Sequence, residues 1–203
     1  SFDCKGTRVV TLNYDLLLES VIDGSARRGD TWRYDYHIRL ADYETRPAAE
    51  EALHTLVFPY LKIHGSLNWF RAAGADRNDV TSVLKVTPGS VQDKVHHADP
   101  PVFVPMAHTR RAFLGGTLFP TLWRTMVYYL ERADEIHFIG YGFPDTDLTL
   151  LLEFTRHREK VRTIVIYDGQ AQFRRRRNRL RRLFPHTRII NNDALEWIAE
   201  QVL

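Results

Sequence analysis

Tyr60-Leu61-Lys62-Ile63-His64-Gly65-Ser66-Leu67-Asn68-Trp69 is the stretch on which the interpretation of the whole chain rests. An apolar run that begins near Leu56 leads into it and predicts a buried β-strand. Ligands of α/β proteins bind at the loops that follow parallel strands, and a histidine titrates near neutral pH. His64 is therefore a candidate general base on a loop at a strand end, outside the core. A histidine that only hydrogen-bonds its own loop fits the same pattern.

Strands and helices alternate along the rest of the chain. We expect strands at Arg8–Leu12, Trp32–Leu40, Val80–Val86, Val102–Pro105, Glu135–Gly140, Val161–Tyr167 and Arg188–Ile190, and helices at Leu16–Ile22, Pro47–Leu56, Thr117–Ala133, Leu148–Thr155, Phe173–Leu183 and Asp193–Val202. This alternation predicts an α/β fold, namely a Rossmann-like parallel sheet with helices on both faces. The strands at Val9, Tyr60–Ile63, Ile136–Ile139 and Ile164–Tyr167 should lie side by side, because near-continuous apolar runs are typical of buried parallel strands.

Length and composition narrow the class of protein. The 203 residues suffice for one domain, so we expect a single domain over 1–203 with a loop-rich insertion at about 71–101. Neither an apolar window of membrane-spanning length nor a signal segment is present in the sequence. The single cysteine, Cys4, excludes an internal disulfide and a multi-cysteine zinc site within this chain. We therefore expect a cytoplasmic protein without a membrane partner.

The net charge of +3 is concentrated in the arginine-rich segment Phe173–Leu183. Phe173, Leu180, Leu183 and Phe184 recur at helical spacing, which predicts an amphipathic helix whose arginines form a solvated, salt-bridged face. A surface for nucleic acid or for an acidic partner is the alternative. We expect no nucleic-acid binding by this domain alone.

Three polar loops follow predicted strands. They are Asn13-Tyr14-Asp15, His64-Gly65-Ser66 and Gly140-Tyr141-Gly142, and in a doubly wound sheet such loops share one rim. The two glycines of the third loop would admit a phosphate or ribose, although Asp145 stands where a dinucleotide fingerprint has its third glycine. Asp168 ends the next strand, where a carboxylate commonly accepts hydrogen bonds from ribose hydroxyls.

These stretches also resemble the motifs of a known family, the bacterial sirtuin-like domains. Thr11–Asp15 resembles their Thr-x-Asn-Tyr-Asp, and Lys62–Ser66 resembles their Lys-Leu-His-Gly-Ser. Val102–Pro105 resembles the strand and proline that often precede their long helix. Ile139–Asp147 resembles their Ile-Gly-Tyr-Ser-Leu-Pro-x-Thr-Asp, with Gly142 in place of the serine. The resemblance runs in order from about Val9 to Pro185.

The resemblance implies an NAD-binding domain, and members of this branch are mostly NAD-hydrolysing effectors of bacterial antiphage defence. It makes His64 the base that deprotonates water or a ribose hydroxyl, and Asn13 the residue that orients the water. The residues expected to contact NAD are Thr11, Asp15, Gly65, Gly140, Tyr141, Gly142, Asp147 and Asp168. For Asp15, capping the helix that follows is an equally good interpretation. A catalytically weak nucleotide-sensing module is the alternative function, and a protein deacylase is a third.

Departures from the family pattern refine these expectations. Sirtuin deacylases carry a four-cysteine zinc module, which one cysteine cannot supply. His96, His97, Asp99 and His108 lack the spacing of metal ligands, so we expect no zinc. The family's first strand and its Gly-rich phosphate-binding loop have no counterpart before Thr11, so we expect a fragment that lacks this βα unit. Other domains or subunits that activate the protein, and a possible homo-oligomer, complete the expected partners.

Overall fold

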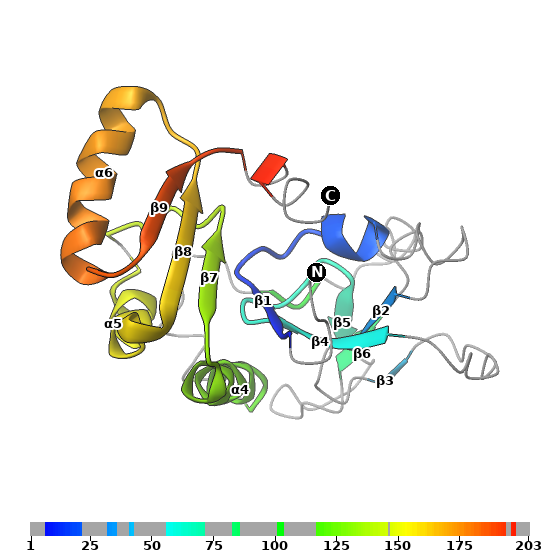
Figure 1. Cartoon of the computed structure of the whole chain (residues 1–203). Helices are drawn as coiled ribbons and strands as arrows, with labels where there is room; N and C mark the ends of the chain where they lie inside the picture. Colours follow the sequence, from blue (N-terminus) through cyan, green and yellow to red (C-terminus); the bar gives the residue numbers. More distant parts are fainter. Residues whose placement is uncertain are drawn as a thin grey trace. The chain divides into compact units, whose positions relative to one another are not determined.

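The computed structural model describes residues 7–21, 32–35, 41–42, 56–71, 83–85, 101–103, 117–145, 147–193 and 196–197. They fall into two compact units, Asp3–Met126 and Val127–Leu203. Each unit contains a parallel sheet (Figure 1). The α/β fold class with parallel, Rossmann-like strands is therefore confirmed, whereas the single domain over 1–203 stays a prediction.

The parallel sheet of the N-terminal unit is built on β4 (Leu56–Lys62). β1 (Val9–Thr11) pairs with its second half, with Val10 opposite Leu61, and β2 (Trp32–Asp35) pairs with its first half. The strand order is β1-β4-β2. Leu61 is fully buried, as its apolar run predicts. Of the helix predicted at 47–56, only residue 56 lies among the described residues, and it begins β4.

A smaller sheet contains β3 (Ala41–Asp42), β6 (Val83–Lys85) and β5 (Trp69–Arg71), in the order β3-β6-β5. β5, which follows the His64 loop in the chain, pairs antiparallel with β6. β6 falls within the strand predicted at 80–86 and confirms it in part. Most of the insertion predicted at 71–101 lies outside the described residues.

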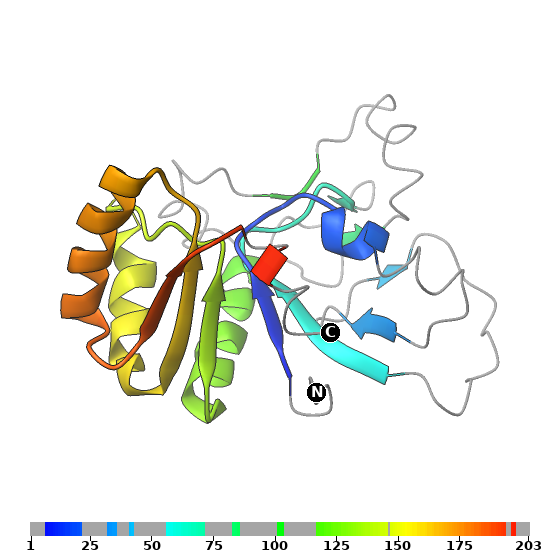
Figure 2. The ribbon, with the colours of Figure 1, turned by 45° about the horizontal axis from the view of Figure 1, so that its top comes forward.

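The C-terminal unit has a parallel sheet in the order β7-β8-β9, formed by Ile136–Ile139, Val161–Ile166 and Arg188–Asn191. α5 (Leu148–Arg156), followed by the short 3-10 helix η4 (Arg158–Lys160), connects β7 to β8, and α6 (Gln170–Leu183) connects β8 to β9. Both connections run in the same direction along the sheet. Since such crossovers are right-handed, α5 and α6 lie on the same side of the strands (Figure 2). Any helix on the opposite face would have to come from another part of the chain.

Apolar side chains at helical spacing fix the helices. α4 (Leu118–Arg132) agrees with the helix predicted at 117–133, and it buries Leu118, Leu122, Met126, Tyr129 and Leu130. Pro120 lies in its first turn, where the missing N–H costs no hydrogen bond. α6 buries Phe173 and Leu180, so its predicted apolar stripe is confirmed. Among the described residues, no helix is long and apolar enough to cross a membrane.

Candidate functional site

The loop after β1 and the loop after β4 are joined by a series of hydrogen bonds. Four backbone carbonyl groups of residues 11–15 accept from residues 62–67: Thr11 from the N–H of Ile63 (3.3 Å), Leu12 from Nδ1 of His64 (3.0 Å), Tyr14 from the N–H of Leu67 (2.9 Å) and Asp15 from Nζ of Lys62. The structure thus brings together the two motif loops of the N-terminal unit. Because carbonyls on both sides of Asn13 are held, the position of Asn13 along the loop is fixed.

His64 is buried, with only 1% of its surface exposed. This corrects the expectation of a loop histidine outside the core. The reason is that residues 101–103 pack against this loop: Ser66 donates its N–H to the carbonyl of Val102 (3.1 Å), and Gly65 forms an antiparallel bridge with Phe103. The partner of Nδ1 is Leu12, which lies on the other motif loop and not on the loop of His64 itself.

The contact with Leu12 sets the tautomer of His64. A carbonyl oxygen can only accept, so Nδ1 carries the proton and donates it across 3.0 Å. In a neutral imidazole the lone pair is then on Nε2. The N-terminal unit therefore holds a histidine in the protonation pattern that a general base needs.

Gly65 is required by the packing of this loop. Its φ is +84°, and a Cβ atom placed on it would lie 2.3 Å from the carbonyl oxygen of Val102 and 2.8 Å from the Cα of Phe103. Only a glycine combines this φ with such a close approach. The contact of Gly65 with NAD stays a prediction.

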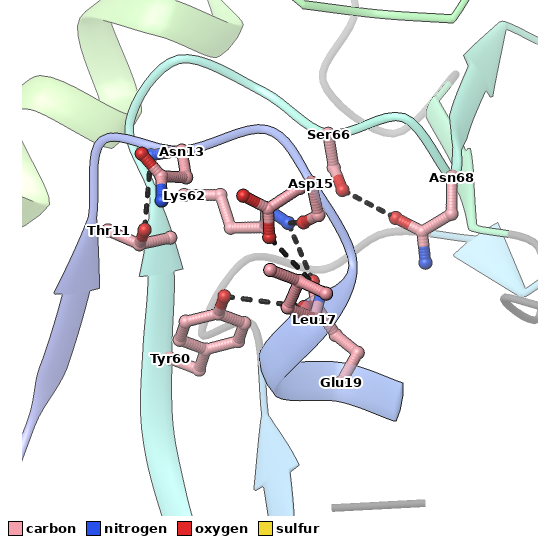
Figure 3. A network of polar contacts seen from close by, with 9 residues as sticks. All are labelled: Thr11, Asn13, Asp15, Leu17, Glu19, Tyr60, Lys62, Ser66 and Asn68. Carbon is pink, nitrogen blue, oxygen red and sulfur yellow. Dashed lines mark hydrogen bonds and ion pairs between the residues drawn. The ribbon is translucent and has the colours of Figure 1, made fainter. Parts of the chain in front are cut away.

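Asn13 is exposed, and its backbone N–H donates to Oγ1 of Thr11 (3.1 Å). Asp15 accepts from the N–H of Leu17 through Oδ1 (3.1 Å), at the start of the helical residues 17–21 (Figure 3). The helix-capping interpretation of Asp15 is therefore confirmed. Its contact with the nicotinamide ribose, and that of Thr11 with NAD, remain predictions.

A buried ion pair lies beneath these loops, and sequence reasoning missed it. Lys62 and Glu19 are both fully buried, with Nζ 2.7 Å from Oε1. Tyr60 donates its hydroxyl to the other carboxylate oxygen of Glu19 (3.4 Å). Burial lowers the pKa of Lys62, and Glu19 opposes that shift. The signal was present in the sequence, since a lysine interrupts an otherwise apolar strand and must find an anion or a carbonyl group inside.

The turn after His64 has its own buried hydrogen bond. Ser66 donates its hydroxyl to the side-chain oxygen of Asn68 (2.7 Å), and neither residue is exposed to solvent. The N–H of Trp69 donates to the carbonyl of Ser66 (3.2 Å), which closes the turn. The polar residues of this motif therefore shape the loop.

In the C-terminal unit, the Gly140–Pro144 loop has a fixed and unusual backbone. Gly140 has φ +73° and donates its N–H to Val165 (2.9 Å). Phe143 has φ +49°, which is rare for a residue with a side chain. Its ring is 1% exposed and contacts the rings of Phe138, Tyr141, Phe154 and Phe184. This aromatic cluster holds the loop in its conformation.

Tyr141 and Asp147, two predicted NAD contacts, bind each other. The tyrosine hydroxyl donates to Oδ2 of Asp147 at 3.0 Å. Burial raises the pKa of Tyr141 above its ordinary value, and the negative charge of Asp147 raises it further. Asp147 stands at the N-cap position of α5 and makes no side-chain capping bond there, so its carboxylate is directed to the tyrosine.

Asp168 follows β8 and is fixed from two sides. Its backbone N–H and carbonyl are both bonded to the side-chain amide of Asn191, at 3.0 Å each. Arg176 of α6 approaches its carboxylate to 2.9 Å, an ion pair without the angles of a hydrogen bond. Arg176 also lies beside Gly142, at ordinary contact distance from a side chain placed there.

A second arginine of α6 holds the other loop. Arg179 donates to the carbonyl of Phe143 and to the carboxylate of Asp145. The salt-bridged arginine helix predicted from the sequence is thus present, and its ion pairs attach it to the loops after β7 and β8. The contact of Asp168 with a ribose stays a prediction.

The structure therefore groups the predicted site residues into two sets. Thr11, Asn13, Asp15, His64 and Gly65 gather in the N-terminal unit, and Gly140, Tyr141, Gly142, Asp147 and Asp168 gather in the C-terminal unit. That both sets surround one NAD molecule stays a prediction. The described ranges contain no cluster of three metal-ligating side chains. His96, His97, Asp99, His108 and Cys4 lie outside the described residues, so the expectation of no zinc is untested.

Comparison with known proteins assigns the chain to a family. The sequence model of the SIR2-like domain matches residues 7–186, a range that includes every motif described above. No curated protein matches the sequence. Because the match spans most of the chain and both units, the chain belongs to the family of SIR2-like domains, which are NAD-binding modules.

Proposed function

We propose that this domain hydrolyses the bond between nicotinamide and ribose in NAD, giving nicotinamide and ADP-ribose. The observation that carries the proposal is the 3.0 Å contact between Nδ1 of His64 and the carbonyl of Leu12. It keeps the lone pair of the imidazole on Nε2, and it attaches the histidine to the loop that carries Asn13. A neutral imidazole and an exposed amide suit the ribose end of NAD, because together they can accept from and donate to a hydroxyl group or a water molecule.

The chemistry asks little of the protein. Cleavage of the bond develops positive charge on the ribose, as in the hydrolysis of other glycosidic bonds. Nicotinamide leaves as a neutral base, so no general acid is needed. In this proposal His64 accepts a proton from water or from a ribose hydroxyl, and the amide of Asn13 orients the water.

The other residues have supporting roles in this proposal. Asp15 shapes the loop through its bond to Leu17, and Thr11 holds the N–H of Asn13. Gly140, Gly142 and Tyr141 would form a wall of the NAD site, with Asp147 holding the hydroxyl of Tyr141. Asp168 would accept from the hydroxyls of a ribose, with Arg176 beside it.

The biological setting follows from the motif resemblance. An NAD hydrolase of this branch would deplete NAD in the cytoplasm of an infected bacterium, as an effector of antiphage defence. Such an activity is harmful unless it is controlled. We therefore propose that other domains or subunits activate the protein, which includes the possibility of a homo-oligomer.

The test is incubation of the protein with NAD in water enriched in oxygen-18, followed by chromatography and mass spectrometry of the products. We expect nicotinamide and ADP-ribose in equal amounts, with one heavy oxygen in the ADP-ribose, because water is the nucleophile. A nucleotide-sensing module would bind NAD without releasing nicotinamide. A deacylase would release nicotinamide only when an acylated peptide is added, and either of these results would replace the proposal.

A further inference from the structure

The buried Lys62–Glu19 pair is not explained by the proposed reaction, although it lies directly under the loops that carry His64 and Asn13. The Lys62 side chain leaves the last position of β4 and reaches toward Asp15 and Glu19 (Figure 3). Its Nζ donates both to Oε1 of Glu19, at 2.7 Å, and to the backbone carbonyl of Asp15. The lysine thus joins a strand, a loop and a helix.

Stability alone does not account for this arrangement. Removing two charges from water costs free energy that their mutual attraction often fails to recover, and replacing a buried pair with apolar side chains is often neutral or stabilising. A buried pair therefore needs another reason to be there. The bond to the Asp15 carbonyl offers one, since it places a fixed donor under the loop two residues after Asn13.

The backbone carbonyl of Asp15 lies after Asn13 in the loop, and two other carbonyls that are held lie before it. The carbonyls of Thr11 and Leu12 are held by Ile63 and His64, just before Asn13. Lys62 holds the far side of the loop through Asp15, next to the bond between Tyr14 and Leu67. The same lysine reaches Glu19 in the helix that follows, so it also keeps that helix in register with β4.

We infer that Lys62 is a positioning residue, which sets the place of the Asn13 amide through the carbonyl of Asp15. The inference rests on the proposed NAD hydrolysis. A shift of about 1 Å in a positioning group can lower a rate about a hundredfold. Loss of the Lys62 donor should therefore reduce kcat for nicotinamide release ten- to a hundredfold, with little change in KM, because Lys62 is buried and does not contact the substrate.

The test separates this role from a structural one. Lys62→Met alone leaves the buried carboxylate of Glu19 without its cation, so that variant is expected to be unstable. The double variant Lys62→Met/Glu19→Gln removes both charges and keeps an acceptor for the Tyr60 hydroxyl, so its unfolding temperature should return close to that of the parent protein. Its kcat should nevertheless stay ten- to a hundredfold low. Recovery of both stability and kcat would overturn the inference, because the pair would then be needed only for folding.

Glu19→Gln decides the matter if the double variant does not fold. This variant loses stability because the buried lysine loses its counter-charge, but the amide oxygen of the glutamine can still accept from Lys62 and the bond from Lys62 to Asp15 remains, so kcat within about threefold of the parent is expected. A tenfold or larger loss in this variant would overturn the inference, since the charge pair and not the carbonyl bond would then control the rate.

Lys160→Met is the matched control. Nζ of Lys160 also donates to two backbone carbonyls, those of Leu130 (3.3 Å) and Glu131 (2.7 Å), but it does so at the end of α4, in the C-terminal unit. This variant should lose some stability and keep its kcat. If the parent protein itself releases no nicotinamide, the proposed function fails and this inference fails with it. If the parent is active and the double variant is equally active, the inference about Lys62 is overturned and the proposed function still stands.

Discussion

The loops of the N-terminal unit and those of the C-terminal unit carry the two halves of the family's motifs, and different kinds of polar contact hold them. In the N-terminal unit, backbone carbonyls of residues 11–15 accept from buried donors of residues 62–67. In the C-terminal unit, partly exposed arginines of α6 pair with Asp168, whose side chain is nearly buried, and with the exposed Asp145. The loops of the N-terminal unit are thus held by buried hydrogen bonds, whereas in the C-terminal unit ion pairs that reach the surface add to the buried ring of Phe143.

This difference predicts different behaviour. Buried donors and acceptors are costly to leave unpaired and are insensitive to salt. Exposed ion pairs contribute little to stability and are screened by salt. The N-terminal loops should therefore hold an accurate geometry, as a group that transfers a proton requires. In the C-terminal unit, the exposed ion pair at Asp145 can be exchanged at small cost, while the buried ring of Phe143 holds the backbone of the loop after β7.

The largest effect on stability should come from adding a methyl group at the centre of the buried set. Gly65→Ala forces a side chain onto a φ of +84° and to within 2.3 Å of the Val102 carbonyl oxygen. Backbone strain and overpacking together should lower the free energy of unfolding by about 3 kcal/mol. Gly169→Ala is the control, because nothing lies within 4 Å of its Cβ position. Urea denaturation measures both, and equal small losses would show that the approach of residues 101–103 is not fixed.

The next largest effect should be on catalytic activity, with little change in stability. Asn13→Ala should reduce nicotinamide release about a hundredfold, or about 2.7 kcal/mol of barrier, because the water loses its orientation. Since Asn13 is exposed, the free energy of unfolding should change by less than about 0.5 kcal/mol. Asn178→Ala, at an exposed position of α6, should alter neither quantity. Unchanged turnover in the Asn13 variant would remove the amide from the mechanism.

A smaller effect on the free energy of unfolding should come from the loop after β7, and this effect should depend on pH. Tyr141→Phe removes a hydrogen bond to the Asp147 carboxylate, which should cost about 1–2 kcal/mol at pH 7. Folding raises the pKa of Tyr141, so the stabilisation is complete below the unfolded pKa of about 10. As the pH rises beyond that value, the unfolded tyrosine loses its proton first and the stabilisation declines.

Urea denaturation of the parent and of Tyr141→Phe at several values between pH 8 and pH 11 measures this decline. The gap between the two proteins should narrow above about pH 10. Tyr167→Phe is the control, since Tyr167 is 76% exposed. A gap that widens with pH would contradict the assignment of the proton to Tyr141.

The smallest effect on the free energy of unfolding is expected for the exposed ion pair between α6 and the loop after β7. Asp145→Asn breaks the ion pair with Arg179, in which the aspartate side chain is 85% exposed, and should cost less than about 1 kcal/mol at low salt. The cost should shrink further in 0.5 M NaCl, where screening is stronger. If Asp145→Asn destabilises the protein as much as Gly65→Ala does, or does so independently of salt, the contrast between the two sets of loops is wrong.

The sequence was sufficient to predict the structural features that depend on neighbouring residues in the chain. The apolar runs gave β4, β7 and β8, and the spacing of Leu118, Leu122 and Met126 gave α4 within one residue at each end. The position of Asp15 gave its bond to the helix start. Each of these features depends on neighbours in the chain, which a pattern records.

The sequence was insufficient to predict contacts between segments that lie far apart in the chain. The burial of His64 depends on residues 101–103, and the partner of Lys62 is Glu19, which belongs to an otherwise ordinary helix. The ring of Phe143 contacts Tyr141 of its own loop and Phe138 of β7, but also the distant rings of Phe154 and Phe184. These contacts follow from the fold, and no local spacing encodes them.

The central claim is that His64, held by the Leu12 carbonyl, is the base for NAD hydrolysis, and the rate of nicotinamide release by His64→Asn tests it most directly. Asparagine keeps an N–H group for that carbonyl and removes Nε2. With circular dichroism showing a folded protein and calorimetry showing NAD binding, the rate should fall a hundred- to ten-thousandfold. The control variant His137→Asn, at an exposed position of β7, should keep the parent rate. A His64→Asn protein that releases nicotinamide as fast as the parent would contradict the account.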